Sequence, residues 1–550
     1  MIGILSFLGF TILVAVISYF ATRTTDEQTS DGYFLGGRSL TAGVIAGSLL
    51  LTNLSTEQIV GLNGSAYTDG LSVMAWETLA AIAIVVAAIF LLPRYLKGGL
   101  TTVPQFLAKR FDVTTKTITS GLFLTGYVVV LLPVILYSGS VAISGMFDVP
   151  TLLGVADSTA LVICIWGIGL IGSVYAVFGG LKAVAVSDSI NAVGLLIGGL
   201  LIPVFGLMAI GDGSVFGGLD VLVSANPERF DSTGNAGQEV PFATIFTGMM
   251  LVQLFYWGTN QQIIQRALGA KNLAEGQKGL LLASFLKILG PLILVLPGMI
   301  AYHYFDGSLD SSDLAYPELV RAVLPKPLVG FFAAVLFGAI LSSFNSVLNS
   351  SVTLFGIDIY KQHINPDASE TTVVKYGKIF GICLALAAMF IAPLIANAGS
   401  LFNYLQEING IYSIPIFTII VVGYLTKRVP AIAAKVGIIS GSALYIISQF
   451  WLKNKFVDEA LADASAKGIT DAAQLKLIEA EAYPHFLHIM AILFVTNIII
   501  MLIIGAIRPR KEPFVLEYTD QVSITPYKYV NQAGILICVI VISIYVYFAK

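Results

Sequence analysis

Long apolar segments recur along the whole chain and are separated by short polar connections. A helix needs roughly 20 mainly apolar residues to cross the hydrocarbon core of a bilayer. Charged residues make up only 11% of the chain, whereas a soluble protein carries about 25%. The sequence therefore predicts an all-α polytopic membrane protein. We expect about fourteen transmembrane helices, at residues 3–22, 40–67, 71–93, 118–144, 158–180, 184–211, 242–261, 279–302, 326–357, 376–396, 399–426, 430–451, 485–507 and 531–549.

The remaining composition excludes several other classes of protein. The net charge of −3 provides no basic surface for a nucleic acid. The three cysteines each lie in an apolar segment, so we expect neither a disulfide framework nor a metal site. The four histidines lie at helix ends or in loops, and no nucleophile–base motif is present. We therefore do not expect an enzyme.

The distribution of Lys and Arg predicts the orientation of the chain. Most of the 30 basic residues fall in loops that follow odd-numbered helices, and such residues are enriched on the cytoplasmic side. We expect a multi-pass protein of the plasma (inner) membrane with both termini outside. The first helix has no basic segment before it, so we expect it to be retained rather than cleaved. The outer segment 452–484, with lysines among acidic residues, is predicted to be a solvated helical insert.

Five ionisable residues fall inside the predicted helices. A charge at the centre of a bilayer costs about 2.5–3.5 kcal/mol on insertion scales. These side chains should therefore face protein or a water-lined cavity, either in a functional site or as structural pairs at helix ends. They are Glu57, Glu77, Asp188, Glu407 and Lys287.

Two of the predicted helices are interrupted by polar residues. The segment Thr52–Gln58 interrupts helix 40–67, and Gln253–Gln262 interrupts helix 242–261, five helices later. Unwound backbone is tolerated in a membrane where it lines a cavity, and paired interruptions indicate a transporter built from inverted repeats. We expect a five-plus-five core with repeats at 40–211 and 242–426. Residues 1–39 would form a first helix and an inner loop, and 427–550 three peripheral helices.

Helix 326–357 contains a stripe of small hydroxyl residues. Ser342, Ser346 and Asn349 have the spacing that places them on one helical face. Such residues commonly pack helices together in membranes. Together with backbone carbonyls freed at the first interruption, they could instead coordinate Na⁺.

At this point the chain resembles the sodium/solute symporter family, and its bacterial sodium/galactose branch most closely. The resemblance covers nearly the whole chain and is specific for the family. It rests on YFLGGRSL (33–40), NLSTEQ (53–58), WE (76–77), YAVFGGLKAVAVSD (175–188), YWGTNQQIIQRAL (256–268), EGQKG (275–279), FLKILGPLILVLPG (285–298), SS with a downstream LNSS (342–351) and YLQEING (404–410).

The resemblance implies a set of substrate-binding residues. Gln58, Glu77 and Lys287 match residues that hydrogen-bond the sugar, and Asn53 and Gln406 match residues that assist. The set suits a neutral polyol, because Glu77 and Lys287 can compensate each other while the amides offer donors and acceptors. Two positions depart from the pattern and leave the particular hexose open. Ala80 replaces a serine that touches the sugar, and Gln253, a further expected substrate-binding residue, replaces an asparagine near the tyrosine gate.

The resemblance also implies two gates. Tyr256 matches the aromatic residue that closes the cavity from inside. Trp76, Leu62 and Phe402 match the apolar cover on the outer side.

Sodium sites follow from the same resemblance. The main site would use the backbone carbonyls of Leu51, Leu54 and Ala339 with the hydroxyls of Ser342 and Ser343. A possible second sodium would lie near Asp188 and Ser346, although Asn345 replaces a hydroxyl residue there. Asp188 could equally be a structural acid at the inner end of its helix.

The resemblance implies import of a neutral sugar, such as galactose or glucose, coupled to Na⁺ by alternating access. The expected partners are the sugar, the sodium ion and the lipid bilayer. The alternatives are a sodium symporter for another small solute (a sugar acid, polyol or amino acid) and a sugar-gated sensor or leak pathway. Neither a nucleic acid nor ATP is expected, since the chain has no phosphate-binding G-x-x-x-x-G-K-[ST] loop.

Overall fold

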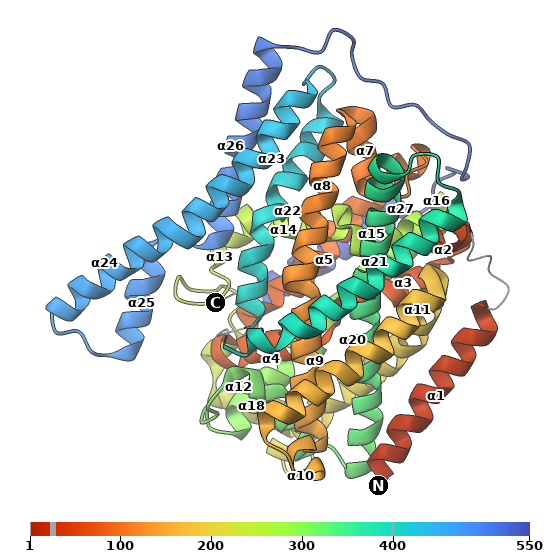
Figure 1. Ribbon diagram of the computed structural model, residues 1–550. Coiled ribbons are helices and arrows are strands. Elements are labelled where there is room, and N and C mark those ends of the chain that lie inside the picture. The colour runs from red at the N-terminus through yellow and green to blue at the C-terminus, as the bar shows by residue number, and fades with distance from the viewer. Residues whose placement is uncertain (1, 23–28, 398–400, 550) are drawn as a thin grey trace.

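Figure 1 shows the computed structural model, which describes residues 2–22, 29–397 and 401–549 of the chain. This part of the chain is helical throughout, and Leu40 and Ala270 form its single β-bridge. The all-α architecture predicted from the apolar segments is confirmed.

The number of membrane-crossing helices is not confirmed as fourteen. Eleven helices of the described residues are long and apolar enough to span a bilayer. A further pair, α16 (Leu273–Ile288) and the helical segment Gly290–Tyr304, is bent by 48° at the break between its two parts. If this pair crosses the membrane as one span, the number is twelve. The difference has two causes. The first interruption leaves Ala42–Asn53 too short to count as a span, and the segment Thr56–Lys97 counts once although the chain leaves the helical conformation at Gly70 (φ 78°, ψ −145°).

Both predicted interruptions are confirmed. The first separates α3 (Ala42–Asn53) from α4 (Thr56–Asp69), where Leu54 and Ser55 leave the helical conformation (ψ 55° and 174°). The second separates α14 (Met250–Thr259) from α15 (Gln261–Leu268) at Asn260, which has ψ 121°. The backbone groups at these four helix ends have no intrahelical partner, so they are available to side chains or ligands.

Asn260 determines where the second interruption lies. Its side-chain oxygen caps α15 by accepting from the backbone N–H of Gln262 (3.1 Å), which is the usual way in which asparagine starts a helix. The same oxygen accepts a hydrogen bond from the Tyr127 hydroxyl (2.5 Å).

The long helix α20 (Lys326–Thr353) is central to the packing. It contacts α1 (Ile2–Thr22), α3, α9 (Leu132–Phe147) and α11 (Asp157–Ile210), which contains two candidate spans. The helices α3 and α11 approach closely at Gly47, where an added Cβ would lie 2.8 Å from the Cα of Ser189. The first interruption is thereby held against α11 and α20.

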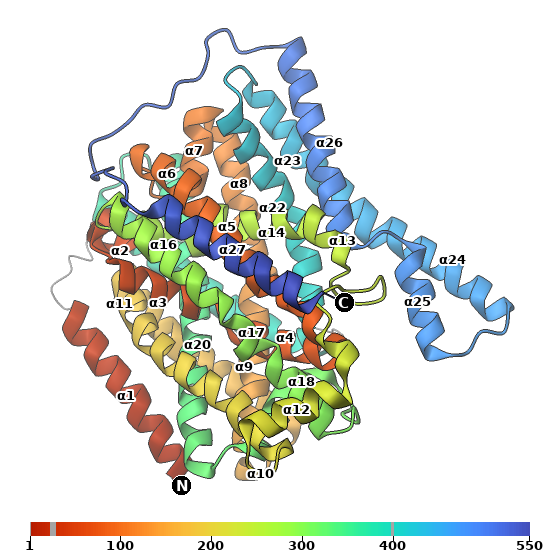
Figure 2. The ribbon, with the colours of Figure 1, turned by 180° about the vertical axis from the view of Figure 1, so that it is seen from behind.

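Two further groups of helices complete the body. In one, α27 (Val530–Phe548) crosses α5 (Ala75–Val86) and α16 (Figure 2). In the other, α22 (Leu401–Leu425), α23 (Ala431–Ile446) and α26 (Phe486–Ile507) pack together. The buried guanidinium of Arg110 donates to the carbonyls of Gly423, Thr426 and Val429 at the end of α22.

The insert at 452–484 forms two helices rather than one. The hairpin of α24 (Lys453–Ala466) and α25 (Ala472–Ala482) projects from the body (Figures 1 and 2). The remaining α-helices are α2 (Ser30–Leu35), α6 (Leu92–Lys97), α7 (Val103–Arg110), α8 (Val113–Gly126), α10 (Val149–Leu153), α12 (Val215–Ala225), α13 (Phe242–Thr244), α17 (Gly290–Leu294), α18 (Leu296–Tyr304), α19 (Ala315–Val323) and α21 (Glu370–Ile391).

Candidate substrate and sodium sites

A cavity of about 60 Å³ lies where the two interrupted helices meet. Small-molecule sites usually measure about 300–1,000 Å³, so this cavity is much smaller than a usual ligand site. The polar residues that line it come from both interruptions, α5 and α22. They are Asn53, Ser55, Glu57, Gln58, Trp76, Gln253, Tyr256, Trp257, Asn260, Gln262, Gln406, Asn409 and Tyr412.

A chain of polar contacts runs beside this cavity. The ammonium of Lys287 on α16 donates to the carboxylate of Glu77 and to the amide oxygen of Asn53. Gln58 donates to the other carboxylate oxygen of Glu77 (3.4 Å), and the Asn53 amide donates to the Tyr256 hydroxyl (3.4 Å). The side chains of Lys287 and Glu77 are 1% and 0% exposed. Four of the six predicted substrate residues thus form one connected cluster.

Three buried oxygens at the cavity find no hydrogen-bond partner in the described residues. They belong to Glu57 (Oε2), Gln58 (Oε1) and Gln262 (Oε1). A buried acceptor without a partner is costly, and ligand hydroxyls could satisfy all three. Glu57 and Gln262 were not among the predicted site residues, although both lie in the polar interruptions that the sequence singles out.

The other two predicted substrate residues also line the cavity. Gln406 reaches it from α22. Gln253 is held in place, because its amide donates to the backbone oxygen of Trp76 (2.8 Å) and accepts from the Trp257 indole (3.2 Å). Their contact with a substrate stays a prediction.

The predicted gate residues fall in different places. Tyr256 and Trp76 line the cavity. Leu62 is fully buried within α4 and is not among the lining residues. The side chain of Phe402 lies outside the described residues.

The predicted main sodium site lies between α3 and α20. Ser343 donates to the backbone oxygen of Thr52 (3.1 Å) at the end of α3. The Ser342 hydroxyl is buried and lies beside the Asp188 carboxylate. Leu51 belongs to the last turn of α3, whose carbonyls lack helical partners. Neutral oxygens of this kind fit a hard cation such as Na⁺, so the residues present suit the predicted ion.

The predicted second sodium position already has a cation beside it. Asp188 accepts from Ser48 (2.6 Å) and lies 3.9 Å from the guanidinium of Arg266. Arg266 also donates to the hydroxyls of Ser48 and Ser346. Asp188 therefore has a protein counterion, as the structural alternative expects, and its role in binding sodium stays a prediction.

Comparison with known proteins determines the family. The model of the sodium:solute symporter family matches residues 33–441, which is most of the chain. The chain belongs to this family. Proteins of this family and fold are sodium-coupled transporters, so the chain is a multi-pass membrane transporter and not an enzyme.

Several relatives of this symporter are known. The uncharacterized symporter YidK of Escherichia coli K12 is 46% identical over 98% of this chain and 90% of its own length. The sodium/glucose cotransporter of Vibrio parahaemolyticus is 33% identical over 80% of this chain and 83% of its own. The human sodium/myo-inositol cotransporter 2 is 30% identical, over 79% of this chain and 68% of its own.

A solved structure shares the fold. The symporter superposes on the substrate-bound outward-open state of a Na⁺-coupled sialic acid symporter with a TM-score of 0.69. The match covers 90% of this chain and 98% of the other, at 19% identity.

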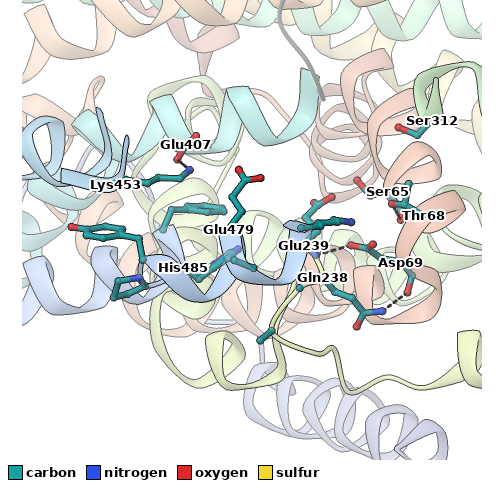
Figure 3. A pocket seen from close by; sticks show the side chains of 17 residues that line it. Ser65, Thr68, Asp69, Gln238, Glu239, Ser312, Glu407, Lys453, Glu479 and His485 are labelled. Atoms are coloured by element: carbon teal, nitrogen blue, oxygen red, sulfur yellow. Dashed lines mark hydrogen bonds and ion pairs between the residues drawn. The ribbon is translucent and has the colours of Figure 1, made fainter. Parts of the chain in front are cut away.

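The symporter has a second, larger cavity of about 400 Å³, which we call the vestibule (Figure 3). It lies between the end of α4, the loop 231–241, α22 and the projecting hairpin. Lys453 of the hairpin pairs with Glu407 of α22 there (2.6 Å). The polar residues that line the vestibule are Ser65, Thr68, Asp69, Gln238, Glu239, Ser312, Glu407, Lys453, Lys476, Glu479, Tyr483 and His485. No motif in the sequence marks this cavity.

Proposed function

We propose that this symporter couples the inward movement of Na⁺ to the uptake of a neutral sugar or cyclic polyol. The observation that carries the proposal is the contact chain from Asn53 through Lys287 and Glu77 to Gln58 beside the cavity. This cluster combines amide donors and acceptors with an ion pair whose charges compensate each other.

The chemistry of the cluster favours a neutral ligand. An anionic substrate would need a cation without a partner, whereas the ammonium of Lys287 is engaged by both Glu77 and Asn53. The hydroxyls of a polyol can instead donate to the free oxygens of Gln58 and Glu57 and accept from the amides. The sodium/glucose and sodium/myo-inositol cotransporters among the relatives support the same class of substrate.

The proposed sodium ion would act next to the sugar site. Ser343 contacts the carbonyl of Thr52, and the next residue, Asn53, contacts Lys287. An ion that braces α20 against α3 would therefore pre-form part of the substrate site, and this coupling must be reciprocal. At −100 mV and a tenfold gradient, one Na⁺ supplies about 3.7 kcal/mol, which supports roughly 500-fold accumulation of the sugar.

The proposal includes the arrangement of the molecule in its membrane. The two repeats, 40–211 and 242–426, would rock against each other to expose the cavity alternately to each side. Both termini and the projecting hairpin would lie outside the plasma membrane.

Uptake into proteoliposomes tests the proposal. We expect an inward Na⁺ gradient, but not a K⁺ gradient, to drive transient accumulation of labelled galactose, glucose or myo-inositol. The Gln58→Ala variant, which removes a cavity amide, should insert normally and lose this uptake. If sodium drives the uptake of sialic acid but of none of these neutral compounds, the proposal of a neutral substrate is wrong. Equilibration without accumulation would identify a leak pathway.

A further inference from the structure

Trp76, which lines the substrate cavity, is held from the opposite side by a residue of the vestibule. Its indole N–H donates to the carboxylate Oε1 of Glu239 (3.1 Å). Its backbone oxygen accepts from Gln253 (2.8 Å), and the residue is only 3% exposed. The indole thus lies between the substrate cavity and the vestibule.

The position of Glu239 is fixed independently of Trp76. The backbone N–H of Glu239 donates to the carboxylate of Asp69 at the end of α4 (2.6 Å), and Gln238 donates to the backbone oxygen of Asp69 (3.0 Å) (Figure 3). Earlier in the same connection, Arg229 donates to the backbone oxygen of Tyr67 (2.9 Å). The connection between α12 and α13 is therefore tied to the outer end of α4 at several points.

We propose that Glu239 is a positioning residue of the outer gate, which holds the Trp76 indole over the substrate cavity until the gate opens. The meaning of this gate for transport rests on the proposed function. The contact between Glu239 and Trp76 can be tested independently of that function, because an indole that is released from Glu239 becomes more accessible to solvent whether or not a sugar is carried.

The surroundings of Glu239 make the contact dependent on pH. The pKa of Glu239 is raised to about 7, chiefly by burial. Hydrogen bonds from the Ser65 hydroxyl and the Trp76 indole lower this pKa, whereas the carboxylates of Asp69 and Asp313 raise it. The other titratable groups that line the vestibule are Glu407, Lys453, Lys476, Glu479, Tyr483 and His485. Hydrogen bonds to a charged acceptor are roughly twice as strong as neutral ones. The gate contact should therefore be strongest above pH 7 and weaken as the pH falls through 7.

Fluorescence of Trp76 tests the contact without a substrate. In purified full-length protein with Trp166, Trp257 and Trp451 replaced by Phe, acrylamide quenching should increase from pH 8 to pH 6, with a midpoint near 7. Glu239→Leu should raise quenching at pH 8 about twofold. Glu239→Gln, which keeps an acceptor but loses the charge, should give intermediate quenching without pH dependence. Glu479→Gln removes another carboxylate that lines the vestibule and should behave as the parent protein.

The inference is overturned if Glu239→Leu leaves the quenching unchanged, or if Glu239→Gln keeps the pH profile of the parent protein. If Glu239→Leu fails to fold, the pH dependence of quenching in Glu239→Gln alone decides whether Glu239 holds the indole. In uptake assays with the parent sequence, Glu239→Leu should lower the maximal rate more than it changes the KM for sugar. Absence of any sodium-driven uptake by the parent protein would refute the proposed function, while the quenching result would still decide the role of Glu239.

Discussion

Lys287 and Glu77 are each tolerated inside the protein because the other is present. Their side chains are almost completely buried and directly paired. Removing one partner of a buried pair typically destabilises a protein by about 3–5 kcal/mol, because the remaining charge is uncompensated, whereas replacing both can be nearly neutral.

We therefore predict that Lys287→Met lowers the thermal unfolding temperature markedly and that the double variant Glu77→Gln/Lys287→Met recovers most of the loss. Both variants should lose sugar uptake, since Lys287→Met removes the ammonium donor and the double variant removes the carboxylate acceptor as well. Thermal unfolding of the purified protein and uptake into proteoliposomes provide the two measurements. A Lys287→Met protein as stable as the parent would show that the pair does not hold the site together.

Ser343 links the two helices of the proposed sodium site. We predict that Ser343→Ala raises the sodium concentration needed for half-maximal uptake, because a hydroxyl ligand and the contact with Thr52 are both lost. Ser351→Ala is the matched control, since that buried hydroxyl bonds to Val347 within the same helix. An unchanged sodium titration for Ser343→Ala would remove Ser343 from the ion site.

At the residue scale, sequence could identify the members of the central cluster but not all of their contacts. Asn53, Gln58, Glu77 and Lys287 lie in recognisable motifs, and the structure places them together. Glu239 was not identified because it lies in a polar loop, where an acid is unremarkable, and only the fold brings it to Trp76.

At the scale of elements, Asn260 decides where α15 begins. We predict that Asn260→Leu destabilises the protein by at least about 1 kcal/mol, the usual cost of losing an N-cap, because the Tyr127 hydroxyl also loses its acceptor. Asn260→Asp keeps an oxygen at the cap and should be affected less. Tyr127→Phe removes only the tyrosine contact. Chemical denaturation in detergent compares the three variants, and equal stability of all of them with the parent would contradict the role of the cap.

The interruptions themselves were predictable, because polar runs within apolar helices favour unwound backbone. The number of spans was not. The helix α3 has only 12 residues, too few to cross a bilayer alone, and whether it continues through a break into α4 depends on tertiary contacts. Similarly, α4 and α5 are connected by the short 3-10 turn Gly70–Met74, and the chain leaves the helical conformation at Gly70 (φ 78°, ψ −145°). Apolar length alone does not reveal such short connections.

At the scale of the whole molecule, the distribution of basic residues predicts which side each loop faces. In a variant without Cys164, Cys383 and Cys538, we expect a single cysteine at Lys467 to react with a membrane-impermeant maleimide in intact cells. A cysteine at Lys427 should react only after permeabilisation. Both positions are exposed, so a lack of labelling would reflect the membrane rather than burial. The reverse pattern would invert the proposed orientation.

The short helix α3 has a consequence for how this symporter can change over evolutionary time. Three of the five proposed sodium ligands, at Leu51, Leu54 and Ala339, are main-chain oxygens, which every amino acid possesses. Drift in their side chains can alter packing while it leaves the ligands themselves in place. A systematic substitution scan would therefore report the ion site as two serines, although most of the site consists of the path of the backbone.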